Sequence, residues 1–136
     1  MVFSVQDDHI HLIAEAEDRA ALSRGLRGLT IRVARTVNRA LARHGVVWAD
    51  RCHFRALTSP RAVRHALVYV LMNRRKHCAG EHGLDPCSSA GWFSGWQDAV
   101  ATPPGAPPVV APRTWLAAVG WRRLGLIDVD ERPRRC

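Results

Sequence analysis

Two pairs of polar side chains have the spacing of a small metal-dependent site. His9 and His11 stand two residues apart in the apolar run "HIHLIAE", so their imidazoles would face the same side of a strand. Tyr69 and Asn73 stand four residues apart in "HALVYVLMN" and would share one face of a helix. Two imidazoles and an amide oxygen can hold Mg²⁺ or Mn²⁺, and a tyrosine hydroxyl beside the ion can attack a phosphodiester.

The same residues also have plain structural interpretations. Histidines in a strand, a tyrosine packed on a helix and an asparagine near a helix end all occur without any metal. His65 and His77 lie one helical turn to either side of the tyrosine–asparagine pair and are further candidate ligands. A separate small zinc site is another interpretation, although its spacing matches no standard finger. Its four candidate ligands are His77, Cys78, His82 and Cys87.

The strands that must position the histidines are predicted from hydrophobic alternation. Residues 2–6 and 9–15 alternate apolar and polar side chains, which predicts two strands. The two aspartates between them predict a turn, or a polar step within one longer strand. Residues 46–58 also have β character and predict a further strand with a break near Asp50. The histidine pair therefore belongs to the second of these strands.

Two helices are predicted from a longer period. Leucine and valine side chains recur every three to four residues from 19 to 44, with arginines on another face, and Gly45 is a natural helix end. Ser59 as N-cap and Pro60 at the first helical position predict a second helix that runs to about His77. The tyrosine–asparagine pair lies on this second helix.

Proline marks the boundary between a main domain and a tail. The segment "ATPPGAPPVVAP" holds five of the eight prolines and predicts a semi-rigid linker over 99–112. Residues 1–98 are the predicted main domain. Residues 113–136 are the predicted tail, with one short amphipathic helix followed by a strand or turn.

The basic residues are numerous and unevenly placed. The formal net charge is +8, and nineteen of the twenty basic residues are arginine. Between Arg19 and Lys76 there are fourteen basic residues against one acid, Asp50. Such a block attracts polyphosphates, and arginine grips phosphate through two parallel hydrogen bonds. The arginines predicted to follow a nucleic-acid backbone are Arg24, Arg27, Arg32, Arg35, Arg39, Arg43, Arg51, Arg55, Arg61 and Arg64.

Size and composition limit the class of protein. A chain of 136 residues fits one domain with its own core. Its apolar runs are far shorter than the roughly 20 residues that a membrane helix needs, and no basic-then-apolar leader opens the chain. The four cysteines are scattered without a CxxC pair. These features predict a cytoplasmic protein with reduced thiols and no membrane partner.

The order of the motifs resembles that of one transposase family. The strand "HIHLIAEAE", with a large apolar residue between its two histidines, looks like the HUH motif. An arginine-rich helix, then "DRCHFRALTSPRAVRHALVYVLMNRRKH", then "DPCSSAGWFSGW" follow in the family's order. Over roughly residues 2–97, and more loosely over the tail, the chain resembles the REP-associated tyrosine transposases of the insertion-sequence-200-like HUH family.

This resemblance implies an α+β fold with a ferredoxin-like antiparallel sheet and two main helices. Members of the family cut and rejoin single-stranded DNA beside small hairpins, through a 5′-phosphotyrosine. Carried over by position, His9 and His11 would be ligands of Mg²⁺ or Mn²⁺. Tyr69 would be the nucleophile, and Asn73 would be the polar third ligand one turn later. The implied partner is single-stranded DNA with hairpins.

The chain departs from the family pattern in two places. Many relatives have Asn-Pro after the tyrosine, where this chain has Asn73-Arg74. The family also places a strand and a helix before the strand that ends here at Gln6, so the resemblance predicts that this first strand and helix are missing. An open sheet edge would result, and a second copy of the chain could fill it in a homodimer.

Two other functions fit the same residues. A decayed or domesticated transposase would grip hairpins of single-stranded nucleic acid without catalysis. A small zinc-stabilised interaction domain would use the histidine–cysteine group instead. Metal-dependent covalent attachment to DNA separates a transposase from the first alternative, and stoichiometric zinc would support the second.

Overall fold

A computed structural model describes residues 1–74 and 83–133 of the chain. The chain divides into two compact units. Unit 1 combines Met1–Glu15 with Leu57–Cys136, and unit 2 is the intervening segment Ala16–Ala56. The described residues form a small α+β structure with a two-stranded antiparallel sheet and three α-helices. None of the helices in these residues is long and apolar enough to cross a membrane.

The sheet of unit 1 is a single hairpin. Strand β1 (Val2–Val5) pairs antiparallel with strand β2 (Ile10–Ile13), which confirms the two strands predicted from alternation. The register places Ser4 opposite His11, so these two side chains share one face of the hairpin. His9 directly precedes β2 and falls on the same face by the two-residue period.

The outer edge of β1 is covered by the loop that carries residues 87–89. The Ser89 N–H donates to the Phe3 carbonyl over 3.0 Å, and the Val5 N–H donates to the Cys87 carbonyl over 2.9 Å. These bonds satisfy backbone groups of β1 that would otherwise face solvent.

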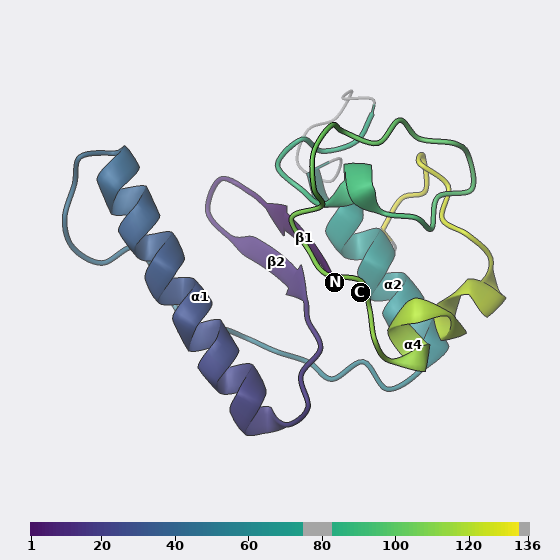
Figure 1. Ribbon diagram of the computed structural model, residues 1–136, viewed down its shortest axis with the longest axis horizontal. Helices are drawn as coiled ribbons and strands as arrows, with labels where there is room; N and C mark the ends of the chain where they lie inside the picture. The colour runs from purple at the N-terminus through teal and green to yellow at the C-terminus, as the bar shows by residue number, and fades with distance from the viewer. Residues whose placement is uncertain (75–82, 134–136) are drawn as a thin grey trace. The chain divides into compact units, whose positions relative to one another are not determined.

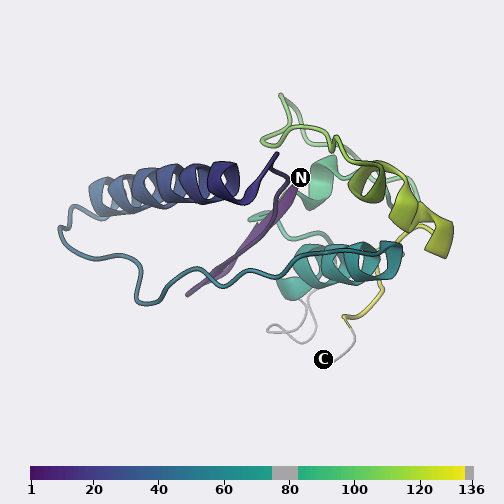
Figure 2. The same ribbon diagram turned by 90° about the horizontal axis from the view of Figure 1, so that it is seen from below.

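Helix α2 (Pro60–Leu71) covers the face of the hairpin that carries the histidines (Figures 1 and 2). It begins as predicted, because the Ser59 hydroxyl accepts a hydrogen bond from the Ala62 N–H and proline occupies the first turn. The helix ends at Leu71, with Met72 as its C-cap, and so is shorter than predicted; Asn73 and Arg74 are helical again after this break, and residues 75–77 of the predicted helix lie outside the described residues. The fully buried side chains of α2 are Val63, Leu67, Val68, Val70 and Leu71.

The C-terminal segment completes the core of unit 1. After the 3-10 helix η1 (Ala90–Trp92), residues 99–112 contain no helix or strand, as their prolines predict. The predicted tail forms helix α4 (Trp115–Ala118) and the 3-10 helix η2 (Gly120–Leu124), which packs against α2. A single β-bridge follows η2, in agreement with the predicted strand or turn. Trp121 is 1% exposed and belongs to the same buried cluster as the apolar side chains of α2.

Unit 2 is built on the long helix α1 (Arg19–Ala40), which confirms the first predicted helix. The Asp18 carboxylate caps its first turn by accepting a hydrogen bond from the Ala21 N–H over 2.6 Å. No side chain of α1 is fully buried. Its leucine and valine stripe is half-buried at Leu22, Leu26, Val33 and Val37.

The C-terminal end of α1 differs from the prediction. The helix ends at Ala40 and not at position 44. Ala42 takes the left-handed conformation with a φ of 47°, and the Arg43 N–H donates to the Asn38 carbonyl over 2.9 Å, which is the bond pattern of a Schellman motif. This motif ends the helix before Gly45, so the glycine is not the capping residue.

The strand predicted over 46–58 does not form, and that prediction is wrong. A strand needs a neighbour that takes up its backbone hydrogen bonds. In unit 2 the segment contacts α1 through side chains instead. The Trp48 indole N–H donates to the Thr30 carbonyl over 3.0 Å, and the Arg19 guanidinium lies 5.7 Å from the centre of the Phe54 ring.

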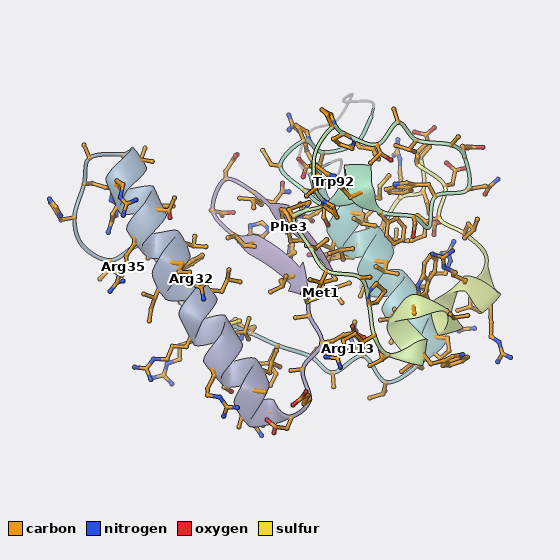
Figure 3. The ribbon with its side chains drawn as sticks, in the orientation of Figure 1. Met1, Phe3, Arg32, Arg35, Trp92 and Arg113 are labelled. Carbon is orange, nitrogen blue, oxygen red and sulfur yellow. The ribbon has the colours of Figure 1, made fainter. Side chains whose placement is uncertain are left out.

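The end of β2 is tied to the start of α4 through Glu15. Its carboxylate accepts hydrogen bonds from the Arg113 and Thr114 N–H groups over 2.8 and 2.9 Å, and from the Thr114 hydroxyl. The Met1 amine donates to the Val110 carbonyl over 3.0 Å, and Figure 3 shows Met1 and Arg113 in this region. Burial raises the pKa of Glu15, but these hydrogen bonds outweigh that effect, so the pKa lies below its ordinary value.

Replacing Glu15 by Gln should lower the free energy of unfolding by about 1 kcal/mol at neutral pH, because hydrogen bonds to a charged acceptor are lost. A carboxyl group whose pKa is lowered by folding stabilises the protein above its unfolded pKa. That stabilisation is lost as the pH falls through the folded pKa. The gap between wild type and Glu15→Gln should therefore close in acid, as urea unfolding at several pH values would measure.

The control is Glu17→Gln, which removes an exposed carboxylate two residues away. It should leave stability unchanged within about 0.5 kcal/mol. Equal losses in the two variants, or a gap that stays constant in acid, would contradict the role of Glu15.

Candidate active site

Helix α2 and the hairpin bring the four predicted site residues together within unit 1. The rings of His9 and His11 have centroids 4.6 Å apart and meet edge-on. The ring of Tyr69 meets that of His11 in the same way, at 5.0 Å. The Nδ2 atom of Asn73 lies 3.4 Å from Nε2 of His9. His9, His11, Tyr69 and Asn73 thus form one cluster.

Two local periodicities produce the cluster. The two-residue period of the strand points both histidines to the side on which α2 packs. Tyr69 lies in the last turn of α2 on the side that meets the hairpin, and Asn73, four residues later and just beyond the end of that helix, approaches His9. Tyr69 packs against the core but is only partly buried, and the His9 side chain is 36% exposed. Solvent can therefore reach the cluster.

Asn73 has an unmet hydrogen-bonding requirement. It is 0% exposed, and its Oδ1 atom is buried with no hydrogen-bond partner in the described part of the chain. A buried polar atom left without a partner costs about 1–3 kcal/mol. A cation beside this oxygen would offset that cost.

The separation between Asn73 and His9 suits two ligands of one small cation. Two donor atoms that each lie about 2.1 Å from an ion, at roughly 90–110° to one another, are about 3.0–3.4 Å apart. The 3.4 Å between the Asn73 amide and His9 Nε2 falls in this range, and a flip of the amide presents its oxygen at the same place. Within residues 1–74 and 83–133, no three histidine, cysteine or carboxylate side chains form a metal site. The pair that fits by this distance is His9 and the amide of Asn73, and the ring of His11 adjoins that of His9 with a centroid separation of 4.6 Å.

Asp8 extends the cluster, although the sequence indicates only a turn or a polar step within a strand at this position. Its Oδ1 atom lies 2.5 Å from Nδ1 of His9. This is the ring nitrogen that does not meet Asn73. The available sequence signal is an acidic residue directly before the first histidine.

Asp85 is a second residue beside the cluster that the sequence does not reveal. Its side chain is 3% exposed, and its carboxylate accepts hydrogen bonds from the Ser4 hydroxyl over 3.0 Å and from the Cys87 N–H over 2.8 Å. Arg74 approaches the same carboxylate at 3.7 Å. Because Ser4 is the strand partner of His11, this buried network holds the hairpin in place next to the cluster. No local pattern around position 85 signals this role.

The other predicted metal ligands are placed only in part. His65 is exposed on α2, and Cys87 is an exposed free thiol. His77, Cys78 and His82 lie outside the described residues. The zinc interpretation and the role of His77 therefore stay predictions.

Most of the predicted phosphate-binding arginines lie in unit 2. Five of them recur at helical spacing on α1, on the side opposite its leucine and valine stripe, and all five are exposed. Figure 3 shows Arg32 and Arg35 projecting from the helix. The arginine face is defined as Arg24, Arg27, Arg32, Arg35 and Arg39. The predicted arginines that are exposed outside this face are Arg43, Arg51, Arg55 and Arg61.

Arg64 differs from the other predicted phosphate-binding arginines. Its guanidinium makes paired hydrogen bonds of 2.7 and 2.8 Å to the Glu131 carboxylate. It also donates to the carbonyls of Gly125 and Leu126, each over 3.0 Å. The side chain ties α2 to the segment after η2, and we assign it this structural role in place of the predicted DNA contact.

Comparisons of the chain with protein-family models, curated proteins and solved structures found no match. Its function is therefore inferred from the cluster and the arginine face themselves.

Arg64→Ala should lower the free energy of unfolding by about 2–3 kcal/mol, because it leaves the Glu131 carboxylate without its bidentate partner. Arg61→Ala removes an exposed arginine one turn earlier on α2 and should change stability by less than about 0.5 kcal/mol. Urea unfolding of both variants measures the contrast. Equal stability of the two variants would rule out the structural role assigned to Arg64.

Proposed function

We propose that this chain is an HUH-type single-tyrosine transposase domain that cleaves and rejoins single-stranded DNA. The observation that carries the proposal is the contact of Tyr69 with His11, inside a cluster that also holds His9 and Asn73. Neither a histidine pair on a strand nor a tyrosine on a helix would by itself indicate this function. A hydroxyl nucleophile beside three polar ligands suits metal-assisted attack on a phosphodiester.

Tyr69 would act as the nucleophile. Its Oη atom attacks the phosphorus of the scissile phosphodiester, so the Oη–P bond forms while the bond from phosphorus to the 3′ oxygen breaks. The tyrosine gives up its hydroxyl proton, and the departing oxygen takes up a proton to become a free 3′-hydroxyl. The 5′-phosphotyrosine conserves the energy of the broken linkage. A later DNA hydroxyl can therefore attack it, release Tyr69 and rejoin a strand.

The residues that would hold Mg²⁺ or Mn²⁺ are His9, His11 and Asn73. When bound, the ion would polarise the scissile phosphate and neutralise the negative charge that develops on it. His11 lies on strand β2 and His9 directly before it, and the amide of Asn73 is buried two residues after the end of α2. Tyr69 lies in the last turn of α2, and Asn73 follows two residues after the end of that helix, so the nucleophile and one ligand come from neighbouring positions of the same segment.

The arginine face would bind the DNA backbone. From Arg24 to Arg39 it extends for about 22 Å along the helix axis, which is enough for several consecutive phosphates. No acidic residue occurs in the sequence between Arg19 and Arg39, so no carboxylate of α1 competes for these side chains. Arginine also stacks on exposed bases, as a single strand requires. The proposed substrate is single-stranded DNA with hairpins.

We further propose that the hairpin belongs to a ferredoxin-like antiparallel sheet in the active protein. In the described residues, β2 has β1 as its strand partner, and a strand from a second copy of the chain is one source of further pairing. We also propose a cytoplasmic location. The free thiols of Cys52 and Cys87 agree with a reducing compartment.

A second candidate function is the binding of hairpin nucleic acid without catalysis. The observation that favours it is the position of the arginine face, which lies in unit 2, while every residue of the cluster lies in unit 1. Binding could then persist in a chain whose cluster is inactive. The two functions differ in one measurable property, which is the covalent tyrosine–DNA bond.

Incubation of the full chain with fluorescent single-stranded hairpin DNA and Mn²⁺ should give a covalent protein–DNA band on a denaturing gel. Tyr69→Phe removes the attacking oxygen and should abolish the band. His11→Ala, or a chelator, should also abolish it, because the cation site is lost. His65→Ala is the matched control, since it removes an exposed histidine of α2 outside the cluster. This variant should keep the band.

Two outcomes of the gel would change the proposal. A band that survives in Tyr69→Phe would overturn the tyrosine mechanism. Salt-sensitive binding by wild type and Tyr69→Phe alike, with no band from either, would favour the binding function over catalysis.

Affinity for single-stranded DNA should fall steeply with salt, because each neutralised phosphate releases counterions. If each arginine of the face contacts one phosphate, log affinity against log salt should have a slope of about −3.5. Joint replacement of Arg32 and Arg35 by alanine should reduce that slope by about 1.4 in magnitude. Fluorescence anisotropy titrations at several salt concentrations measure it. The control is the joint replacement of Arg122 and Arg123 by alanine, which removes the same charge from η2. Equal slopes in the two double variants would argue against the arginine face as the DNA-binding surface.

A further inference from the structure

Asp8 and Asn73 lie at the two different nitrogens of the His9 ring. The Oδ1 atom of Asp8 is 2.5 Å from Nδ1, and the Nδ2 atom of Asn73 is 3.4 Å from Nε2. An ionised carboxylate can only accept a hydrogen bond, so a neutral ring in this position carries its proton on Nδ1. Nε2 then directs a lone pair toward Asn73.

Asp8 and not Asn73 determines which nitrogen carries the proton. The amide of Asn73 can turn either its oxygen or its nitrogen toward Nε2, so it accommodates both tautomers. The carboxylate of Asp8 accommodates one. With the proton on Nε2, the lone pair of Nδ1 would face a negatively charged oxygen at hydrogen-bonding distance.

We infer that Asp8 is a positioning residue that holds His9 in the tautomer with Nδ1 protonated, so that Nε2 is ready to ligate a cation. The role of the cation rests on the proposed function, but the tautomer is a property of the metal-free protein. In metal sites generally, a ligating histidine donates its second ring N–H to a carboxylate or carbonyl, which fixes the ring and raises its basicity. Here the donor and acceptor are adjacent in the sequence.

Exposure to solvent limits the effect of Asp8. Its side chain is 88% exposed and that of His9 is 36% exposed, so water competes for both partners. Loss of an outer partner weakens metal binding about 10- to 100-fold in general. The exposure of Asp8 places the expected loss at the lower end, about 10-fold. The His11 ring, whose centroid lies 4.6 Å from that of His9, also limits the rotation of the His9 ring.

The tautomer can be measured on the metal-free full chain by nitrogen NMR of the histidine rings at about pH 8, where an ordinary imidazole is neutral. The His9 signals are assigned by their loss in His9→Gln. We expect a protonated Nδ1 and a bare Nε2 in wild type, and a mixture of tautomers in Asp8→Ala. Asp7→Ala, the same change one residue earlier, should leave His9 as in wild type. The inference is overturned if Asp8→Ala shows the single tautomer of wild type.

Calorimetric titration with Mn²⁺ gives a second and independent readout. Wild type and Asp7→Ala should bind equally, and Asp8→Ala should bind about 10-fold more weakly. Equal affinities in all three proteins would overturn the positioning role. A wild type that binds no Mn²⁺ would instead contradict the proposed function, and the NMR measurement would still decide whether Asp8 holds the tautomer.

Discussion

The structure of unit 1 depends on the packing of α2 against one face of the β1–β2 hairpin. Side chains alternate along a strand, so the face that buries Val2 and packs Ile13 against the core must also carry His11. A slip of one residue in the register would turn His11 to the other face and bring an apolar neighbour in its place. Burial of apolar surface therefore selects the register. The register in turn brings the histidines to the helix that carries Tyr69.

Two buried polar side chains next to the hairpin, Asp85 and Asn73, differ in how many hydrogen bonds their oxygen atoms accept. The carboxylate of Asp85 accepts hydrogen bonds from the Ser4 hydroxyl, the Gln6 amide and the backbone N–H of Cys87. These bonds hold β1 to the loop that carries Asp85 and Cys87. Asn73 is buried more completely, yet its Oδ1 atom has no partner in the described ranges. Protein interiors rarely keep such an atom. Its presence beside two histidines is what an inward-facing metal ligand requires, and it supports the proposed cation site.

The two units separate the chemical features of the chain. The cluster belongs to unit 1, whereas unit 2 carries the arginine face on a helix in which no side chain is fully buried. Local interactions close both ends of that helix, with Asp18 as N-cap and a Schellman motif after Ala40. Dense positive charge on an exposed helix also repels itself, and binding of phosphates would relieve that repulsion.

Local signals in the sequence determined where the elements begin and which side chains share a face. The first residues of the two helices, after Asp18 and Ser59, were predictable because capping acts within a few residues. The alternation of side chains in the hairpin was predictable because its period is equally local. The strand predicted over 46–58 has suitable residues but no pairing partner, which only the fold decides. Arg64 looks like a surface arginine in the sequence, yet it binds Glu131, 67 residues later. The meeting of the histidine pair with the tyrosine–asparagine pair is of the same kind. It comes from packing between segments that lie far apart in the chain. The free energy of that packing cannot be read from the spacing of residues within one segment.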